Sequence, residues 1–218
     1  EKLQRHIRFL FAKGSIYLRC NSNLLYHGCI PLTEDGKLET VNVRGQKVKG
    51  RKYLDLAEKI CREAYFNRAN SAKEKLNCDY VWYMWCGKNS PMFGKDSMKT
   101  FERYFIEDKA THTEKKNNYY TFYNEEATCN MLLEEFDLNP KISHIVNGHV
   151  PVKVKKGESP IKANGKLYII DGGFSRAYQP ETGIAGYTLI YNSYGLKLVS
   201  HAPFESTEKA IKEGKDII

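Results

Sequence analysis

Apolar residues recur every three or four positions in several stretches of the chain, as they do on a helix that packs one face against a core. The clearest stretch runs from Arg51 to Arg68. The same spacing predicts helices over 3–12, from Ser71 into the aromatic residues 80–85, after a cap at Asp96, after a cap at Asn124 and over 206–212. We expect the block 80–85 to be buried because it is apolar on every side. We expect the same of two helical stripes, namely Met98, Phe101 and Phe105, and Cys129, Leu132, Leu133 and Phe136.

Shorter apolar or alternating runs between these helices predict β-strands. They cover 15–20, 23–27, 142–146, 166–171, 187–191 and 196–201. The pair Arg44-Gly45 marks a turn in a polar segment and predicts a small hairpin. Because the chain has no internal repeat and no interdomain linker, we expect one α/β (α+β) domain that spans residues 1–218.

The composition is that of a soluble globular protein. Apolar residues make up 41% of the 218 residues and charged residues 28%, so the chain can bury a core. It has no run of eighteen apolar residues, and we expect no transmembrane helix. The chain starts without Met or an apolar signal region, and we interpret it as a piece of a longer polypeptide. Its six cysteines form no CxxC pair, which indicates free thiols in a reducing cytoplasm.

The charge balance favours anionic partners. Thirty-four Lys and Arg residues outnumber twenty-six Asp and Glu residues, which gives a formal net charge of +8. This surplus fits phosphorylated metabolites, nucleic acid or an acidic protein surface, and it does not choose among them. Fifteen tyrosines beside the basic charge are compatible with a nucleic-acid-binding module. The expected burial of the aromatic stripes counts against that class.

Two histidines stand at the ends of predicted strands. His27 precedes Gly28, and His149 follows Gly148. Strand ends that face one edge of a sheet are where α/β proteins assemble their sites, and a neighbouring glycine lets the backbone turn the imidazole inward. The two histidines are therefore candidate ligands of one divalent metal ion, with a hydrogen-bonded structural role as the alternative. They do not complete a catalytic metal site, which normally has three or more protein ligands.

Two segments are candidates for contact with an anion. Residues 86–95 resemble a phosphate-binding loop but lack the Gly and the Ser or Thr that the Walker pattern requires at 89 and 96. Their glycines and the ammonium groups of Lys88 and Lys95 suit an anion. A solvated turn between helices is the alternative interpretation. Lys153 and Arg176 are the other basic residues that we expect near an anionic substrate.

Six longer motifs resemble one enzyme family. They are HGCIP at 27–31, WCGKNSPMFGK at 85–95, TFERYFI at 100–106, NGHVPVK at 147–153, IDGGFSRAYQ at 170–179 and TGIAGYTL at 182–189. Residues 15–205 are similar to the second half of the bacterial class III fructose-1,6-bisphosphatases, a branch of the calcineurin-like metallophosphoesterases. The resemblance implies part of a β sandwich flanked by helices, and it assigns His27 and His149 to the metal site.

The resemblance also implies that part of the metal site lies outside this chain. The superfamily motifs that precede the HG element, Gly-Asp-x-His among them, do not occur here. Pro151 replaces the second histidine of the common GHxH motif. We therefore expect half of a dinuclear Mn²⁺ site and no activity from this chain alone. The missing ligands would come from the N-terminal portion of the same polypeptide.

For the intact enzyme, the resemblance implies hydrolysis of the 1-phosphate of fructose 1,6-bisphosphate to fructose 6-phosphate and phosphate, a step of gluconeogenesis. We expect the distal phosphate to lie among Lys88, Lys95, Lys153 and Arg176. One alternative is another calcineurin-like phosphoesterase that acts on a dinucleoside polyphosphate or a phosphoprotein. The basic nucleic-acid-binding module is the other alternative. We expect no nucleic-acid or membrane partner for the favoured function.

Overall fold

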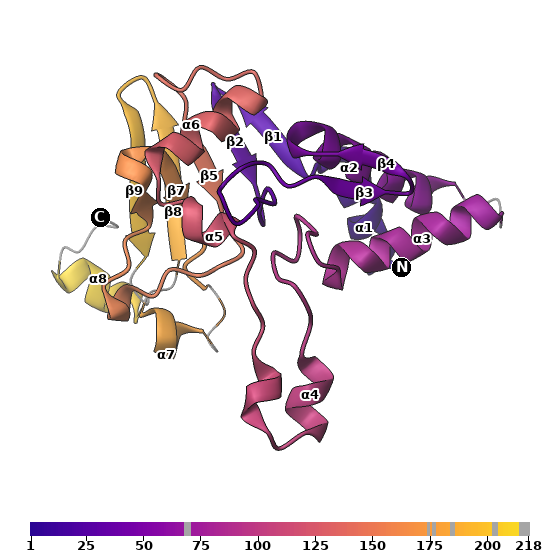
Figure 1. The fold of residues 1–218 in the computed structure, drawn as a ribbon. Coiled ribbons are helices and arrows are strands. Elements are labelled where there is room, and N and C mark those ends of the chain that lie inside the picture. The colour runs from indigo at the N-terminus through magenta and orange to yellow at the C-terminus, as the bar shows by residue number, and fades with distance from the viewer. Residues whose placement is uncertain (68–70, 174, 176–177, 184–185, 202–204, 214–218) are drawn as a thin grey trace.

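A five-stranded sheet organises the structure. The computed structural model describes residues 1–67, 71–173, 175, 178–183, 186–201 and 205–213. The strand order is β1 (Tyr17–Cys20), β2 (Asn23–Tyr26), β5 (Ile145–Asn147), β7 (Leu167–Ile169) and β6 (Ile161–Lys162). Strands β2, β5 and β7 are parallel, and the edge strands β1 and β6 are antiparallel to their neighbours (Figure 1). The carboxyl ends of the three parallel strands therefore meet at one edge of the sheet.

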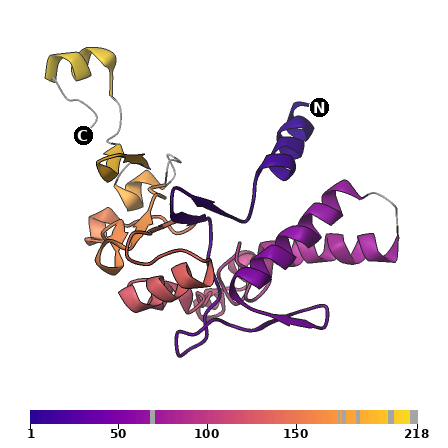
Figure 2. The same ribbon diagram turned by 90° about the horizontal axis from the view of Figure 1, so that it is seen from above.

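The sheet shares its core with three helices. They are α2 (Gly50–Phe66), α3 (Ala72–Cys86) and α6 (Glu126–Glu135), and α2 and α3 pack side by side (Figure 2). Leu24, Ile145 and Leu167 of the parallel strands are fully buried in one cluster with Leu54 of α2 and Leu132 of α6. The apolar run 145–146 belongs to this core because a strand between two others has both faces covered. The helical stripe of α6 belongs to the same core.

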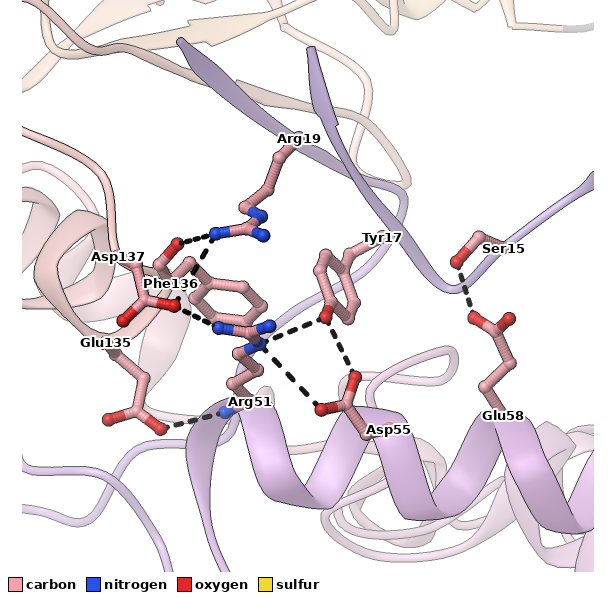
Figure 3. Close-up of polar contacts among 9 residues, drawn as sticks. All are labelled: Ser15, Tyr17, Arg19, Arg51, Asp55, Glu58, Glu135, Phe136 and Asp137. Carbon is pink, nitrogen blue, oxygen red and sulfur yellow. Dashed lines mark hydrogen bonds and ion pairs between the residues drawn. The ribbon is translucent and has the colours of Figure 1, made fainter.

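A network of polar side chains ties α2 to the edge strand β1 and to the end of α6 (Figure 3). The hydroxyl of Tyr17 donates to Asp55 at 2.8 Å, and the Nε atom of Arg51 lies 3.3 Å from the same hydroxyl. The guanidinium of Arg51 pairs with Asp137, and its backbone amide donates to Glu135 at 3.0 Å. These contacts hold the first turn of α2 against the sheet.

Two hairpins and several further helices lie outside the five-stranded sheet and its three helices. The hairpins are β3 (Val41–Val43) with β4 (Gln46–Val48), and β8 (Gly186–Asn192) with β9 (Gly195–His201). The first turns at Arg44-Gly45, both with positive φ, as predicted. The short helices are α1 (Lys2–Lys13), α5 (Tyr119–Phe122), α7 (Gln179–Thr182) and α8 (Thr207–Glu213), with 3-10 turns at Val154–Lys156 and Ala163–Gly165. No helix in the described ranges is long and apolar enough to cross a membrane.

Residues 95–116, here called the α4 extension, project from the body on two arms (Figure 1). The extension carries α4 (Thr100–Phe105) and the 3-10 helix Lys109–His112. Its arms meet at a backbone bridge between Lys95 and Lys116. The amide of Asp96 donates to the carbonyl of Lys115 at 2.9 Å next to this bridge. The base of the extension is therefore fixed, while α4 lies away from the sheet.

The α+β class and most of the predicted elements are confirmed. The predicted helix over 51–68 corresponds to α2, and the predicted strand runs correspond to β1, β2, β5, β7, β8 and β9. The stripe Cys129, Leu132, Leu133 and Phe136 is fully buried. The calcineurin-like sandwich and the single domain over 1–218 stay predictions.

Two burial predictions are wrong. Trp82 and Trp85 are 65% and 64% exposed, because α3 turns Tyr80 and Met84 to the core and presents the tryptophans on another face. Phe101 and Phe105 are 74% and 81% exposed, because the α4 extension carries them away from the core. Spacing along a helix gives a common face but does not say whether anything covers it.

Two predicted helix caps are also wrong. The Asp96 carboxylate accepts from the amide of Lys115 at 3.1 Å, and α4 begins later, at Thr100. Helix α6 has Glu125 rather than Asn124 at its N-cap position. Asp96 instead lies in the arm of the extension, and Asn124 lies in the turn just before α6.

Candidate functional site

The structure brings the two predicted histidines together at one edge of the sheet. Strands β2 and β5 are parallel neighbours, with Tyr26 opposite Asn147, so both strands end at the same level of the sheet. The Nδ1 atom of His149 lies 3.1 Å from the Nε2 atom of His27. Their ring planes are 81° apart. Residues separated by more than a hundred positions therefore present ring nitrogens to one another.

The side chain of Asn147 holds this arrangement from beneath. It is buried, and its Nδ2 atom lies 3.1, 3.2 and 2.9 Å from the carbonyl oxygens of Tyr26, His27 and Gly28. Its Oδ1 atom accepts from the hydroxyl of Tyr119 at 3.2 Å. One amide at the end of β5 thus binds the backbone that carries His27. Sequence reasoning missed Asn147, although a polar residue inside an apolar strand end is a usable signal.

Close packing at Gly28 brings a loop across the end of the sheet. A Cβ atom at Gly28 would lie 2.0 Å from the carbonyl oxygen of Pro91, so only glycine fits there. The same carbonyl accepts from the amide of Cys29 at 2.8 Å. The loop then places the carbonyl oxygen of Phe93 at 3.0 Å from the Nε2 atom of His149. The segment that resembled a phosphate-binding loop therefore orients a histidine.

The contact with Phe93 fixes the tautomer of His149. A carbonyl oxygen only accepts, so Nε2 carries the proton and Nδ1 has a free lone pair. Burial lowers the pKa of His149, and the nearby charges of His27 and Lys95 lower it further. The Phe93 carbonyl and the Asp171 carboxylate act in the opposite direction without reversing the shift. His149 is therefore neutral at pH 7, with its lone pair directed at His27.

The histidine pair fits a shared metal ion. The two facing ring nitrogens, 3.1 Å apart, would be near enough to hold the same divalent ion. A ligating histidine usually donates its other N–H to a carbonyl, as His149 does to Phe93. In the described part of the chain, no cluster of three or more His, Cys, Asp or Glu side chains is suited to hold a metal. A complete site needs ligands from beyond these residues.

A cleft of about 380 Å³ opens beside His149. Three lysines, Lys95, Lys116 and Lys153, line it together with Tyr120. Two of the four predicted substrate-binding residues, Lys95 and Lys153, thus lie next to the histidine pair. Lys116 was not predicted as a substrate contact, because it belongs to a polar segment whose composition indicates an exposed loop.

The other two predicted substrate-binding residues are not part of this cleft as described. Lys88 is exposed and does not line the cleft. Arg176 lies outside the described residues. The site assembled by the structure therefore consists of the histidine pair and a basic cleft on one side of it.

Comparison with known proteins gives the family. The family described as Firmicute fructose-1,6-bisphosphatase matches residues 1–218. Relatives named fructose-1,6-bisphosphatase class 3 from Clostridium botulinum (strain Langeland) and Alkaliphilus metalliredigens are each 61% identical to the chain, over 218 and 219 residues. Each match covers all of this chain, which spans about a third (33%) of the relative's length. No solved structure matches the chain. The chain therefore belongs to the Firmicute fructose-1,6-bisphosphatase family.

Proposed function

We propose that the full-length protein hydrolyses the 1-phosphate of fructose 1,6-bisphosphate and that this chain supplies part of the catalytic site. The observation that carries the proposal is the 3.1 Å approach of His149 and His27 beside a cleft lined by lysines. Family membership supports the substrate. Because the chain spans about a third of its relatives, the activity belongs to the whole polypeptide and the remaining metal ligands to the rest of it.

His27 and His149 would hold a divalent ion, which we propose to be Mn²⁺, through Nε2 and Nδ1. When bound, divalent ions supply Lewis acidity for phosphoryl transfer. The chain contributes the orientation of the two imidazoles, since Phe93 keeps the proton on the far nitrogen of His149. Binding through Nε2 requires His27 to carry its proton on Nδ1. Neutral imidazoles keep the site positive, which suits an anionic substrate.

The basic cleft would hold the phosphorylated sugar next to the histidine pair. Lys95 and Lys153 lie on its walls and are proposed substrate contacts. Lys88 and Arg176 stay predictions for the same role. We place the reaction in gluconeogenesis and in the cytoplasm, in line with the six free cysteines of the chain.

The family match favours this substrate over the alternatives. A dinucleoside polyphosphatase or a phosphoprotein phosphatase would share the strand-end histidines but not the match over all 218 residues. The expected burial of the aromatic stripes no longer argues against a nucleic-acid module, because Phe101 and Phe105 are exposed. The family match now carries that argument.

The test replaces His149 with Ala in the full-length enzyme. We expect kcat/KM with Mn²⁺ and fructose 1,6-bisphosphate to fall at least 100-fold, and the affinity for Mn²⁺ to fall as well. His144→Ala is the matched control. The ring of His144 packs against the ring of Tyr168, with the ring centres 5.7 Å apart, and it does not belong to the histidine pair. Unchanged kinetics and unchanged Mn²⁺ affinity in His149→Ala would remove the histidine pair from the mechanism.

A further inference from the structure

The three lysines of the cleft differ in their partners. The Nζ atom of Lys95 lies 2.6 Å from the carboxylate of Glu114, which also pairs with Arg103 at 3.2 Å. The Glu114 side chain is 7% exposed, so this carboxylate contacts the two cations rather than solvent. Lys95 is therefore engaged in holding the base of the α4 extension, and its charge is already offset.

Lys116 and Lys153 have no such carboxylate. Within the described ranges, no ion pair involves either ammonium group. The carboxylate of Glu158 accepts from the backbone amide of Lys153 at 3.0 Å. Partial burial lowers the pKa of Lys116, and the charges of Lys153 and Lys95 lower it further, against the effect of Glu158. Like charges held together at a cleft wall repel one another, and an anion between them removes that cost.

An aromatic ring lies next to Lys116 at the wall of the cleft. The Nζ atom of Lys116 lies 5.6 Å from the ring centre of Tyr120, which lines the cleft. The Tyr120 hydroxyl is buried and has no hydrogen-bond partner among the described residues. Gly94 leaves room for it, since a Cβ atom there would lie 2.7 Å from the hydroxyl oxygen. The hydroxyl is therefore closed off from the cleft, and it is the ring of Tyr120 that borders Lys116.

We infer that Lys116 and Lys153 form the subsite for the phosphate group that is not hydrolysed, with the reacting phosphate at the His27–His149 pair. This inference rests on the proposed function. It keeps Lys153 from the earlier basic candidates and adds Lys116, because Lys95 is bound to Glu114 and Lys88 does not line the cleft. Arg176 lies outside the described residues and stays a prediction. The ligand class is a phosphorylated sugar whose second phosphate needs two ammonium donors rather than a metal.

The experiment uses Lys116→Gln and Lys153→Gln in the full-length enzyme, with Lys141→Gln as the control, because Lys141 is exposed and does not line the cleft. With fructose 1,6-bisphosphate, we expect KM to rise about 10- to 100-fold in each cleft variant while kcat stays within about 3-fold. With fructose 1-phosphate, which lacks the second phosphate, we expect the kinetics of variants and wild type to agree. An equal loss on both substrates, or no loss on either, would overturn the subsite.

A binding measurement separates this subsite from the proposed function. Calorimetry with fructose 6-phosphate, which retains only the second phosphate, should show Kd about 10-fold weaker in both cleft variants and unchanged in Lys141→Gln. If the wild-type enzyme hydrolyses no fructose 1,6-bisphosphate but this binding depends on Lys116 and Lys153, the subsite stands and the proposed function fails. If hydrolysis occurs and binding ignores both lysines, the subsite alone is wrong.

Discussion

Asn147 stands two positions before His149, and its side-chain nitrogen lies 3.2 Å from the carbonyl oxygen of His27. The amide of Gly148 donates to the same carbonyl at 3.2 Å. The strand that delivers one histidine therefore binds the backbone of the other. His149 itself has a left-handed backbone conformation, with φ 67°, which turns its ring back toward His27. The spacing of the two imidazoles depends on these contacts.

Replacing Asn147 with Ala should separate the histidines. The buried carbonyls of Tyr26, His27 and Gly28 would lose their shared donor, at a cost of about 1–3 kcal/mol in the free energy of unfolding. We expect Mn²⁺ affinity in the full-length protein to fall about 10-fold or more. Urea denaturation and a Mn²⁺ titration followed by electron paramagnetic resonance measure the two effects.

Tyr119→Phe is the matched control for Asn147→Ala. It removes one hydroxyl that donates to the Oδ1 atom of Asn147 at 3.2 Å and leaves the amide donors in place. We expect a smaller loss of stability and nearly normal metal affinity. If Asn147→Ala lowers stability but leaves Mn²⁺ affinity unchanged, Asn147 supports the fold without positioning the site.

Gly28→Ala should be poorly tolerated. The new Cβ atom would lie 2.0 Å from the carbonyl oxygen of Pro91, which is backbone and cannot rotate away. We expect a loss of about 3 kcal/mol or more in the free energy of unfolding. Gly148→Ala, where the nearest atom would lie at 3.5 Å, should cost less than about 1 kcal/mol. Equal stability of the two variants in urea denaturation would show that the loop can withdraw from the sheet.

The α4 extension should be less stable in acid. Burial of Glu114 would raise its pKa, but its contacts with Lys95, the amide of Lys99 and Arg103 outweigh burial and lower the pKa from 4.5. Because the folded form binds the proton more weakly than the unfolded form, these contacts stabilise the folded state above pH 4.5. Their contribution is lost as the pH falls through the lowered pKa.

Glu114→Gln tests this pH dependence. At pH 7 the variant should lose about 1–3 kcal/mol of unfolding free energy, or show faster proteolysis within residues 95–116. As the pH falls through the lowered pKa of the wild-type carboxyl, the difference from the wild type should shrink, because both side chains are then uncharged. The exposed Glu107→Gln is the control, with no expected change over the same pH range. A difference that does not shrink as the pH is lowered would contradict an electrostatic role for Glu114.

The exposed aromatic residues of α4 should contribute little to stability. Phe101 is 74% exposed, so Phe101→Ala should change the free energy of unfolding by less than about 0.5 kcal/mol. Phe136→Ala at a fully buried position should cost about 3–5 kcal/mol. Thermal or urea denaturation of both variants measures the contrast. A large loss in Phe101→Ala would show that the phenylalanine is covered by another part of the protein.

Local patterns in the amino-acid sequence were enough to predict most helices and strands and the position of each histidine at a strand end. Apolar spacing of 3.6 or 2 residues reflects which face of one segment is buried, so α2, the stripe of α6 and the short strands follow from it. Glycine next to His27 and next to His149 also marks places where the backbone turns or packs closely. All of these signals act within about ten residues of the chain.

The contacts between residues far apart in the sequence follow from the three-dimensional packing of the elements. The parallel pairing of β2 with β5 sets His27 beside His149, and the fixed base of the α4 extension sets Lys116 beside Lys153 and Tyr120. The exposure of Trp82 and Phe101 was likewise decided by whether another element covers them. Such contacts depend on strand order and chain direction, and these are properties of the whole fold because many arrangements bury the same local faces equally well.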